Sequence, residues 1–228
     1  METVVITGAN RGIGLELTRV FLSKDFHVIA SCRRPDQASE LQALAESKEL
    51  EIHELDVTDA SSISAFSSAL SDITVDMLIN NAGVFGGERQ SLNSMDYDIW
   101  LETFNVNTIA PFHVTIALKN NLKKAERPRV VTLSSQMGSL SRKSTDYYAY
   151  RSSKAALNKV MQVMALELKE DNIIVCPVHP GWVRTDMGGA EADITAQESA
   201  SGLYQLIDSL TMEQSGRFWT WQRDEHPW

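Results

Sequence analysis

Residues 3–14 read TVVITGANRGIG, and this stretch carries the strongest indication of the fold. The β-branched run TVVIT is typical of a buried parallel strand. It leads into a glycine-rich turn, after which apolar residues recur at helical spacing as far as residue 22. A strand, a glycine-rich turn and a helix in this order are the context of a dinucleotide-binding loop. An ordinary glycine-rich turn in a sheet protein is the alternative.

The three glycines of this turn suit a phosphate-binding loop. Gly8, Gly12 and Gly14 would allow a tight turn, close approach of the backbone to a pyrophosphate, and close packing of the helix on the sheet. Their spacing is GxxxGxG rather than GxGxxG. The first N–H groups of the following helix would then face the phosphates.

Strand and helix patterns alternate along the rest of the chain without a break in composition. This rhythm predicts one doubly wound α/β domain over residues 1–228, a Rossmann fold with a parallel sheet and helices on both faces. Ligands of such sheets bind at the carboxyl ends of the strands. The expected strands after the first are 26–31, 51–55, 75–80, 129–134, 172–178 and 217–221, and the later helices are 35–48, 59–71, 96–122, 147–170 and 197–210.

A candidate catalytic pair lies in the run YAYRSSK, residues 148–154. On a helix, Tyr150 and Lys154 stand one turn apart on the same face, so an ammonium lies beside a phenol. A neighbouring positive charge favours phenolate, and we therefore expect a lowered pKa for Tyr150 and acid–base chemistry at this position. A surface pair without function is the alternative.

Two arginines follow the second expected strand, where an NAD-selective enzyme usually has a carboxylate. Arg33 and Arg34 suit a 2'-phosphate through charge-assisted bonds, and Arg11 in the glycine turn could reach the same group. The pattern predicts NADP(H), with Arg33 and Arg11 ahead of Arg34. A solvated surface pair is the alternative.

Five motifs together resemble the short-chain dehydrogenase/reductase family. They are TGANRGIG (7–14), NNAG (80–83), the serine pair 134–135, YRSSK (150–154) and HPGWVRTDM (179–187), in the family's order and approximate spacing. The resemblance extends from Met1 to about Met187. The tail ending in HPW and the additional residues before Tyr150 are most similar to the branch of C-factor and Sniffer-type carbonyl reductases. The resemblance implies an NADP(H)-dependent oxidoreductase that transfers hydride to a small-molecule aldehyde, ketone or quinone.

The resemblance also implies the catalytic roles. Ser135 and Tyr150 would polarise the substrate carbonyl, with Tyr150 as the general acid in reduction. Lys154 would lower the pKa of the phenol and hold the nicotinamide ribose. The distance along the chain from Ser135 to Tyr150 is longer than usual by about two residues, which leaves Ser139 as a lesser alternative.

By the same resemblance, Asn107 would hold a water that links Lys154 to solvent, with Asn105 as the competing candidate. Asp56 would accept from the adenine amino group, although Asp56 or Asp59 could instead cap the next helix. The expected nucleotide contacts are Gly8, Asn10, Arg11, Gly12, Ile13, Gly14, Arg33, Asp56, Val57, Asn80, Ala82, Gly83, Tyr150, Lys154, Pro180, Val183 and Thr185.

Composition narrows the possible partners. A net charge of −9 argues against nucleic acid and anionic membranes, which both need a basic surface. The two cysteines are expected to be buried free thiols, and no Cys/His spacing indicates a metal site. The sequence starts without a basic and apolar export signal, so we expect a cytoplasmic location.

Further expectations concern the substrate pocket, His179, the oligomeric state and an alternative function. The short stretch 187–194 predicts an open pocket that admits varied carbonyl compounds, with Trp182 as a wall. His179 precedes a proline, which restricts its backbone, and its family counterpart is not catalytic. The apolar surface of helix 147–170 predicts a homodimer. A nucleotide-binding signalling or sensor protein with little turnover remains the alternative function.

Overall fold

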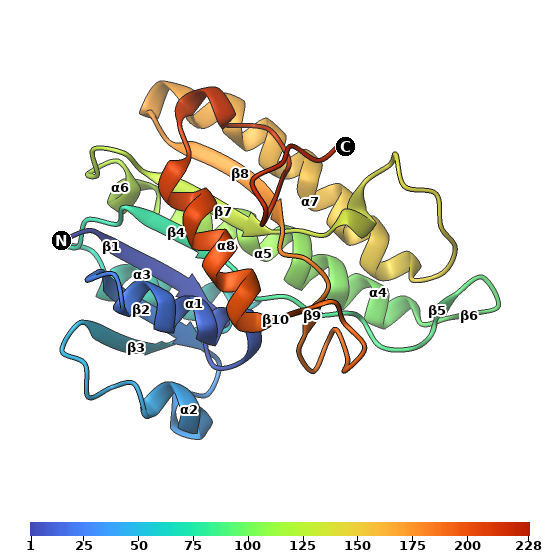
Figure 1. The fold of residues 1–228 in the computed structure, drawn as a ribbon, viewed down its shortest axis with the longest axis horizontal. Helices are drawn as coiled ribbons and strands as arrows, with labels where there is room; N and C mark the ends of the chain where they lie inside the picture. Colours follow the sequence, from blue (N-terminus) through green and yellow to red (C-terminus); the bar gives the residue numbers. More distant parts are fainter.

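The computed structural model describes residues 1–228 and has a seven-stranded parallel sheet at its centre (Figure 1). The strand order is β11–β8–β7–β4–β1–β2–β3. Successive strands are added on one side of β1 up to β3 and on the other side from β4 onward, so the order of the strands switches between β1 and β4. The expected doubly wound α/β fold is confirmed. The strands are β1 (Thr3–Thr7), β2 (His27–Cys32), β3 (Leu50–Glu54), β4 (Met77–Asn80), β7 (Arg129–Leu133), β8 (Ile174–His179) and β11 (Trp219–Thr220).

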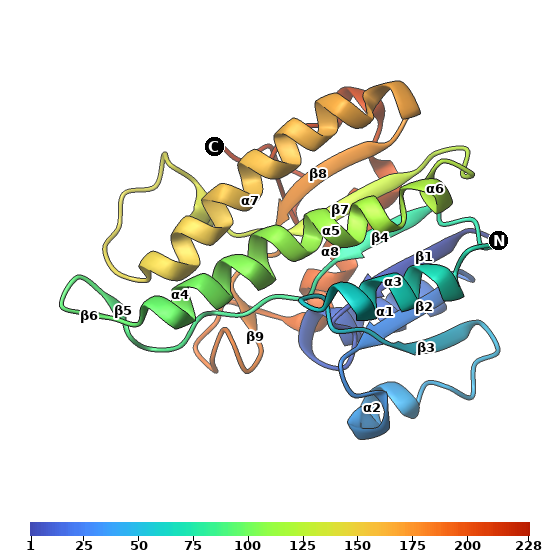
Figure 2. The same cartoon turned by 180° about the vertical axis from the view of Figure 1, so that it is seen from behind.

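Helices cover both faces of this sheet. On one face, α1 (Gly12–Leu22) packs against α8 (Ala196–Ser209) (Figure 1). The opposite face carries the remaining long helices, with α7 alongside α4 and α5 (Figure 2). These are α3 (Ala60–Ala69), α4 (Tyr97–Phe104), α5 (Ala110–Ala117) and α7 (Tyr148–Glu167), with the single turn α6 (Lys119–Leu122) after α5.

The sheet separates two hydrophobic cores. Successive strand residues point to opposite faces, so Val4 and Ile6 join the core beneath α1 and α8, whereas Val5 joins the core beneath α3, α5 and α7. The same alternation continues in β8, where Cys176 and Val175 lie in different cores. Burial on both faces explains why the strands are nearly continuous apolar runs.

The expected helix over residues 35–48 is wrong. A 3-10 turn (Pro35–Gln37) and the single turn α2 (Ser39–Gln42) replace it. This segment lies beyond β3 at the edge of the molecule (Figure 1), and α2 buries only Leu41. Without a continuous apolar face to pack against the sheet, helix propensity alone does not maintain a longer helix.

The expected continuous helix over residues 96–122 is interrupted. Residues 105–109 form a π-helical segment between α4 and α5. Pro111 explains the interruption, because proline has no N–H to donate to the carbonyl of Asn107 and its ring crowds that carbonyl. The consequence is functional, since π segments re-aim side chains and this one contains Asn107.

Two short strand pairs were not expected. The antiparallel hairpin β5 (Gln90–Ser91) and β6 (Ser94–Met95) precedes α4, and the parallel pair β9 (Val183–Arg184) and β10 (Ile194–Thr195) precedes α8. Strands of two residues leave no periodic signal in a sequence.

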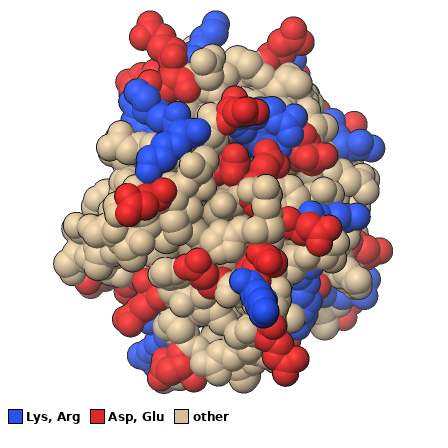
Figure 3. Space-filling view, turned by 90° about the vertical axis from the view of Figure 1, so that its left-hand side faces the viewer, with Lys and Arg blue, Asp and Glu red and all other residues tan.

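Surface charge is mixed rather than segregated on the side where the strands begin. Acidic and basic side chains are interspersed over that side (Figure 3). None of the helices has both the length and the apolar character that crossing a bilayer requires.

Candidate active site

The glycine turn after β1 has the backbone of a phosphate-binding loop. Gly8 and Gly12 adopt positive φ angles of 65° and 54°, which favour glycine. A Cβ on Gly14 would lie 2.4 Å from the Gly8 carbonyl oxygen, so this position admits no side chain. Helix α1 begins at Gly12 without a capping side chain, leaving its first N–H groups available to an anion. Asn10 and Ile13 lie half-buried in the same turn.

Asn81 holds this turn in place, although it was not among the expected site residues. Its side-chain nitrogen donates to the carbonyl oxygens of Thr7 at 2.8 Å and Gly8 at 2.9 Å. In return, the Thr7 hydroxyl accepts from the backbone N–H groups of Asn81 and Ala82, both at 3.1 Å. Its position as the second asparagine of the NNAG motif could have indicated this role from the sequence.

Asn80, which the family resemblance implies both as a nucleotide contact and as a tie between strands, has its side chain engaged within the sheet. Its side-chain nitrogen donates to the hydroxyls of Thr115 on α5 at 3.1 Å and Thr132 on β7 at 3.4 Å, and the residue is buried. The Asn80 amide therefore ties β4 to its neighbours. Ala82 and Gly83 remain at the carboxyl end of β4, both half-buried.

The arginines expected to select the coenzyme are exposed at the ends of β1 and β2. Arg34 donates to Gln37 within its own turn at 3.4 Å, whereas the Arg33 guanidinium has no partner. Arg11 pairs with Asp186 at 2.7 Å, and both side chains are exposed. This ion pair joins the glycine turn to the loop after β9, so it spans the two ends of the expected nucleotide site.

Of the two acidic residues after β3, Asp59 takes the capping role, and the adenine contact of Asp56 stays a prediction. Asp59 caps α3 by accepting from the Ser61 N–H at 2.8 Å. Asp56 instead accepts from the N–H of Thr58 at 2.9 Å and from its hydroxyl at 2.7 Å. Next to it, Val57 lines a small hollow at the carboxyl edge of the sheet, together with Ala82 and others.

The serine pair after β7 separates into a structural and a site residue. The Ser134 hydroxyl donates to the Asn158 oxygen on α7 at 2.5 Å, which fastens the strand to that helix. The Ser135 hydroxyl lies near the phenol of Tyr150 and acts to lower its pKa, and it accepts from the Met137 N–H at 3.1 Å. Only the second serine therefore meets the tyrosine.

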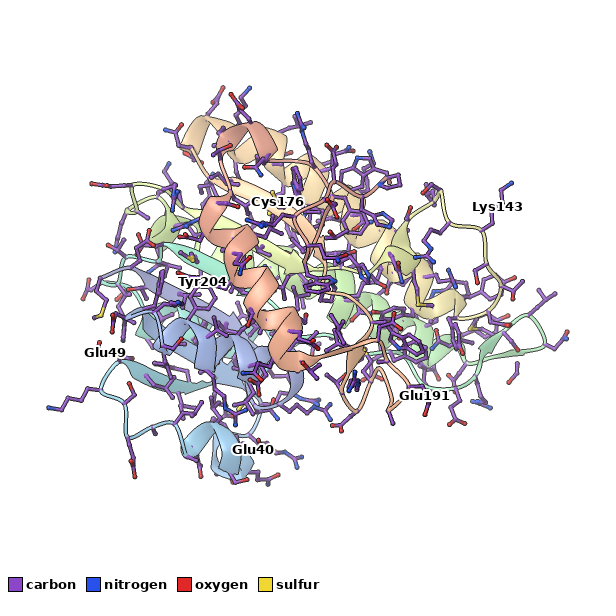
Figure 4. All side chains as sticks on the ribbon, viewed as in Figure 1. Glu40, Glu49, Lys143, Cys176, Glu191 and Tyr204 are labelled. Carbon is purple, nitrogen blue, oxygen red and sulfur yellow. The ribbon has the colours of Figure 1, made fainter.

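Ser139, the lesser alternative, is occupied elsewhere. Its hydroxyl donates to the Pro227 carbonyl at 2.8 Å and shares a hydrogen bond with the Ser141 hydroxyl at 2.7 Å. The Ser141 N–H also donates to the Trp228 carbonyl at 3.0 Å. Ser139 thus anchors the tail of the chain to the loop before α7. Lys143 marks the outer part of this loop and points away from the body of the molecule (Figure 4).

The electrostatics of the tyrosine–lysine pair differ from the expectation. The Lys154 ammonium lies 5.8 Å from the centre of the Tyr150 ring and donates to the Leu133 carbonyl at 2.7 Å. Burial lowers the pKa of Lys154 to about 8. Burial also raises the pKa of Tyr150, and the nearby Ser135 hydroxyl opposes this rise. The expected lowering of the Tyr150 pKa by Lys154 is wrong here, because loss of solvent dominates.

Asn107 lies in the π segment, fully buried beside the lysine. Its side chain accepts from the Val84 N–H and donates to the Val84 carbonyl, both at 2.9 Å, and donates to the Ser153 hydroxyl at 3.0 Å. A Cβ on Gly83 would lie 3.3 Å from the Asn107 oxygen and 3.7 Å from the Lys154 nitrogen. Gly83 therefore leaves the gap where these two groups approach each other. Asn105, the competing candidate, is half-buried and its side chain makes no hydrogen bond.

The segment after β8 closes the other end of the site. The Pro180 carbonyl accepts from Ser199 on α8 at 2.6 Å, and Val183 begins β9. The Thr185 hydroxyl accepts from the Gly188 N–H at 3.2 Å. A Cβ on Gly12 would lie 3.2 Å from a Thr185 carbon, so this segment touches the glycine turn.

Aromatic side chains border the tyrosine on the substrate side. The Phe85 ring lies 5.0 Å from Tyr150 and 5.0 Å from Tyr147, measured between ring centres. Trp182 is 46% exposed at the start of the short loop that includes Glu191 (Figure 4). Arg184 ties this loop back on itself by donating to the Ala192 carbonyl at 2.9 Å.

The tryptophans near the end of the chain pack inside the protein, and the buried His179 lies close to the same tail. Trp219 joins the core beneath α8, and Trp228 stacks on Phe218 with 5.8 Å between ring centres. His179 is buried, and burial, with smaller contributions from His226 and Arg142, lowers its pKa to about 4. His179 therefore stays neutral at physiological pH and lies outside the serine–tyrosine pair. Its lack of a catalytic role stays a prediction.

Comparison with known proteins agrees with this geometry. The family model described as short chain dehydrogenase matches residues 2–196. The C-signal protein of Myxococcus xanthus is 42% identical over 72% of this chain and 99% of its own length. The carbonyl reductase Sniffer of D. melanogaster has a TM-score of 0.94 at 30% identity, with both chains covered completely. An NADPH-bound carbonyl reductase from chicken fatty liver has a TM-score of 0.94 at 33% identity, covering 100% of this chain and 99% of that one. The resemblance to the C-factor and Sniffer branch is confirmed.

Proposed function

The chain belongs to the short chain dehydrogenase family, and from this premise we propose that it is an NADPH-dependent carbonyl reductase. The observation that carries the proposal is the position of the Ser135 hydroxyl beside the buried phenol of Tyr150, one helical turn from the buried ammonium of Lys154. These groups meet at the carboxyl ends of the strands, where ligands of doubly wound sheets bind.

The residues of the glycine turn fit a dinucleotide phosphate. The uncapped start of α1 offers N–H donors, and the packing of Gly14 keeps the turn close to the helix. The unpartnered guanidinium of Arg33, with Arg11 across the turn, would hold a 2'-phosphate. Val57 and Ala82 offer apolar surface to an adenine ring. The solved relatives bound to NADP or NADPH support this coenzyme.

Catalysis by this site would combine two hydroxyls that polarise the carbonyl with a hydride from the coenzyme. Bound NADPH supplies the hydride that adds to the carbonyl carbon. Ser135 and Tyr150 donate hydrogen bonds to the carbonyl oxygen, which gains negative charge as the reaction proceeds. Tyr150 then transfers its proton to that oxygen, and its raised pKa keeps the proton on the phenol at neutral pH.

Lys154 would return the proton to Tyr150, and Asn107 would hold the water that links Lys154 to solvent. The two side chains approach each other across Gly83, and a buried lysine with a pKa of about 8 gains and loses protons near neutral pH. Asn107 holds the Val84 backbone on one side and Ser153 of α7 on the other. This arrangement keeps the relay aligned with the helix that carries the tyrosine.

The direct test is turnover. Purified protein should oxidise NADPH when it is given a panel of aldehydes, ketones and quinones, measured by the loss of reduced-nicotinamide absorbance. Broad activity would agree with the short loop 187–194 that leaves Trp182 exposed. Absence of turnover over the whole panel, despite NADPH binding, would contradict the proposal.

Similarity to C-signal favours a second candidate, a nucleotide-binding signalling protein with little turnover. The two candidates differ in whether a biological effect depends on the phenol. Loss of the effect in Tyr150→Phe favours the enzyme, and an unchanged effect favours the signalling protein.

The face formed by α4, α5 and α7 supports assembly as a homodimer. Large apolar side chains are exposed on these neighbouring helices, which lie together on one face of the sheet (Figure 2). Apolar surface exposed on neighbouring helices typically packs against another protein surface. The residues are Leu101, Phe112, Ile116, Val163 and Leu166, with Ile109 of the π segment.

A further inference from the structure

Helix α7, which carries the catalytic pair, begins without a cap of its own. The residue before it, Tyr147, has a φ of 55° and makes no capping side-chain hydrogen bond. The first N–H groups of a helix have no partner within the helix and need acceptors from outside. Tyr150 is the third residue of α7, so its N–H is one of these groups, and it is normally the residue before the helix that accepts from this position.

Gln90, sixty positions earlier in the chain, supplies the missing acceptor. Its side-chain oxygen accepts from the Tyr150 N–H at 2.8 Å. Its side-chain nitrogen donates to the carbonyl oxygens of Phe85 at 2.8 Å and Gly87 at 2.7 Å. The residue is 1% exposed, so water does not compete for these three bonds.

The same amide also controls what lies against the tyrosine ring. The Phe85 carbonyl is held by Gln90, and the Phe85 ring packs on Tyr150 at 5.0 Å between centres with 38° between planes. Gly86 lies between the two anchored carbonyls at a φ of 89°, and a Cβ there would lie 2.4 Å from the Thr103 hydroxyl of α4. The loop is therefore seated tightly against α4, and Gln90 joins it to the start of α7.

We propose that Gln90 is a positioning residue that sets the place of the Tyr150 phenol relative to Ser135. This inference rests on the proposed function, in which Tyr150 is the proton donor. An uncharged amide is required because the side chain must accept at one atom and donate twice at the other. Leucine fills the volume but leaves the Tyr150 N–H and two carbonyls unpaired. Glutamate keeps the acceptor but places negative charge against two carbonyl oxygens.

The test compares Gln90→Leu and Gln90→Glu with Gln162→Leu, a control on α7 whose side chain hydrogen bonds only with Lys159. In Gln90→Leu we expect kcat for carbonyl reduction to fall by about tenfold or more, because small misplacements of catalytic groups are costly. The KM for NADPH should change much less than kcat, since Gln90 bonds only the backbone of Tyr150 and no other expected nucleotide contact. Gln90→Glu should recover activity as pH falls, because its protonated carboxyl regains one donor.

A second measurement is independent of turnover. Amide hydrogen exchange at Tyr150, followed by NMR, should be faster in Gln90→Leu than in the parent protein, and unchanged in Gln162→Leu. If the parent protein reduces no carbonyl compound, the proposed function fails and this exchange measurement still tests the anchor. If Gln90→Leu does not fold, Gln90→Glu gives the same comparison. Unchanged kcat and unchanged exchange in a folded variant would overturn the inference.

Discussion

Burial moves the two titrating side chains of the site in opposite directions. It raises the pKa of Tyr150 and lowers the pKa of Lys154 to about 8, because each group is less stable as an ion away from water. As pH rises, Lys154 therefore loses its proton before Tyr150 does. The phenol of Tyr150 therefore keeps the proton that reduction would use, whereas Lys154 carries its positive charge mainly below a pH of about 8.

The first prediction concerns this order of titration. The kcat/KM for carbonyl reduction should fall as pH rises through about 8, because Lys154 becomes neutral there and no longer assists the phenol. Lys154→Arg keeps its charge over this range and should move the decline to higher pH. A steady-state pH profile measures both. A decline at the same pH in the arginine variant would contradict the assignment to Lys154.

Coenzyme choice is the second property decided by single residues. Arg33→Ala should lower kcat/KM for NADPH by about ten- to a hundredfold, the value of a hydrogen bond to a charged group. Its effect on NADH should be small, because NADH has no 2'-phosphate. Arg34→Ala is the matched control, since Arg34 already donates to Gln37. Equal losses with both coenzymes would refute the role of Arg33.

At the scale of elements, local patterns were sufficient for β1, the glycine turn and α1. The strand run, the glycines and the helical spacing all agree within residues 3–22, so these elements could be predicted locally, although Asn81 also holds the turn. The π segment around Asn107 was not predicted, because its position depends on Pro111 inside an otherwise helical pattern. The hairpin that carries Gln90 was not predicted either, because its two-residue strands are too short for periodicity.

Distant hydrogen bonds explain which site residues the sequence missed. Asn81 and Gln90 act through backbone atoms of segments that are remote in the chain, namely the glycine turn and the start of α7. Their residue type alone gives no sign of such partners. In contrast, Ser135, Tyr150 and Lys154 were candidates because their chemistry and order resemble a known family.

The third prediction tests the contact between the turn after Ser135 and α7. Gly138 packs so closely that a Cβ would lie 2.6 Å from the Lys154 carbonyl carbon. Gly138→Ala should therefore lower the free energy of unfolding by about 1–3 kcal/mol, as overpacking does, and should also reduce activity. Urea denaturation and turnover measure the two effects. Ser144→Ala, at an exposed position of the same loop, is the control. Full stability and activity in Gly138→Ala would contradict this packing.

At the scale of the whole molecule, the sheet brings together site residues that are distant in the chain. It also separates the two hydrophobic cores on its opposite faces. The site lies at the carboxyl edge, with the nucleotide contacts expected near β1 and β2 and the catalytic groups between β7 and α7. The helices on the α7 side leave apolar surface exposed, which the other side chains of the monomer do not cover.

The fourth prediction concerns this surface. The protein should sediment as a dimer, and Leu166→Glu combined with Phe112→Glu should convert it to a monomer by placing charge in the contact. Leu92→Glu is the control, because Leu92 is also exposed but lies in the turn of the β5–β6 hairpin rather than on α4, α5 or α7. Analytical ultracentrifugation gives the masses. A parent protein that sediments as a monomer at all concentrations would contradict the prediction.

The most direct test of the whole account is Tyr150→Phe, which removes one buried hydroxyl and leaves the ring against Phe85. Reduction of the carbonyl panel should fall by about 10²–10⁴-fold, the contribution of a positioned general acid. The affinity for NADPH, measured by titration calorimetry, should stay close to that of the parent protein. Carbonyl reduction at the parental rate in the folded variant would show that the phenol is not the proton donor.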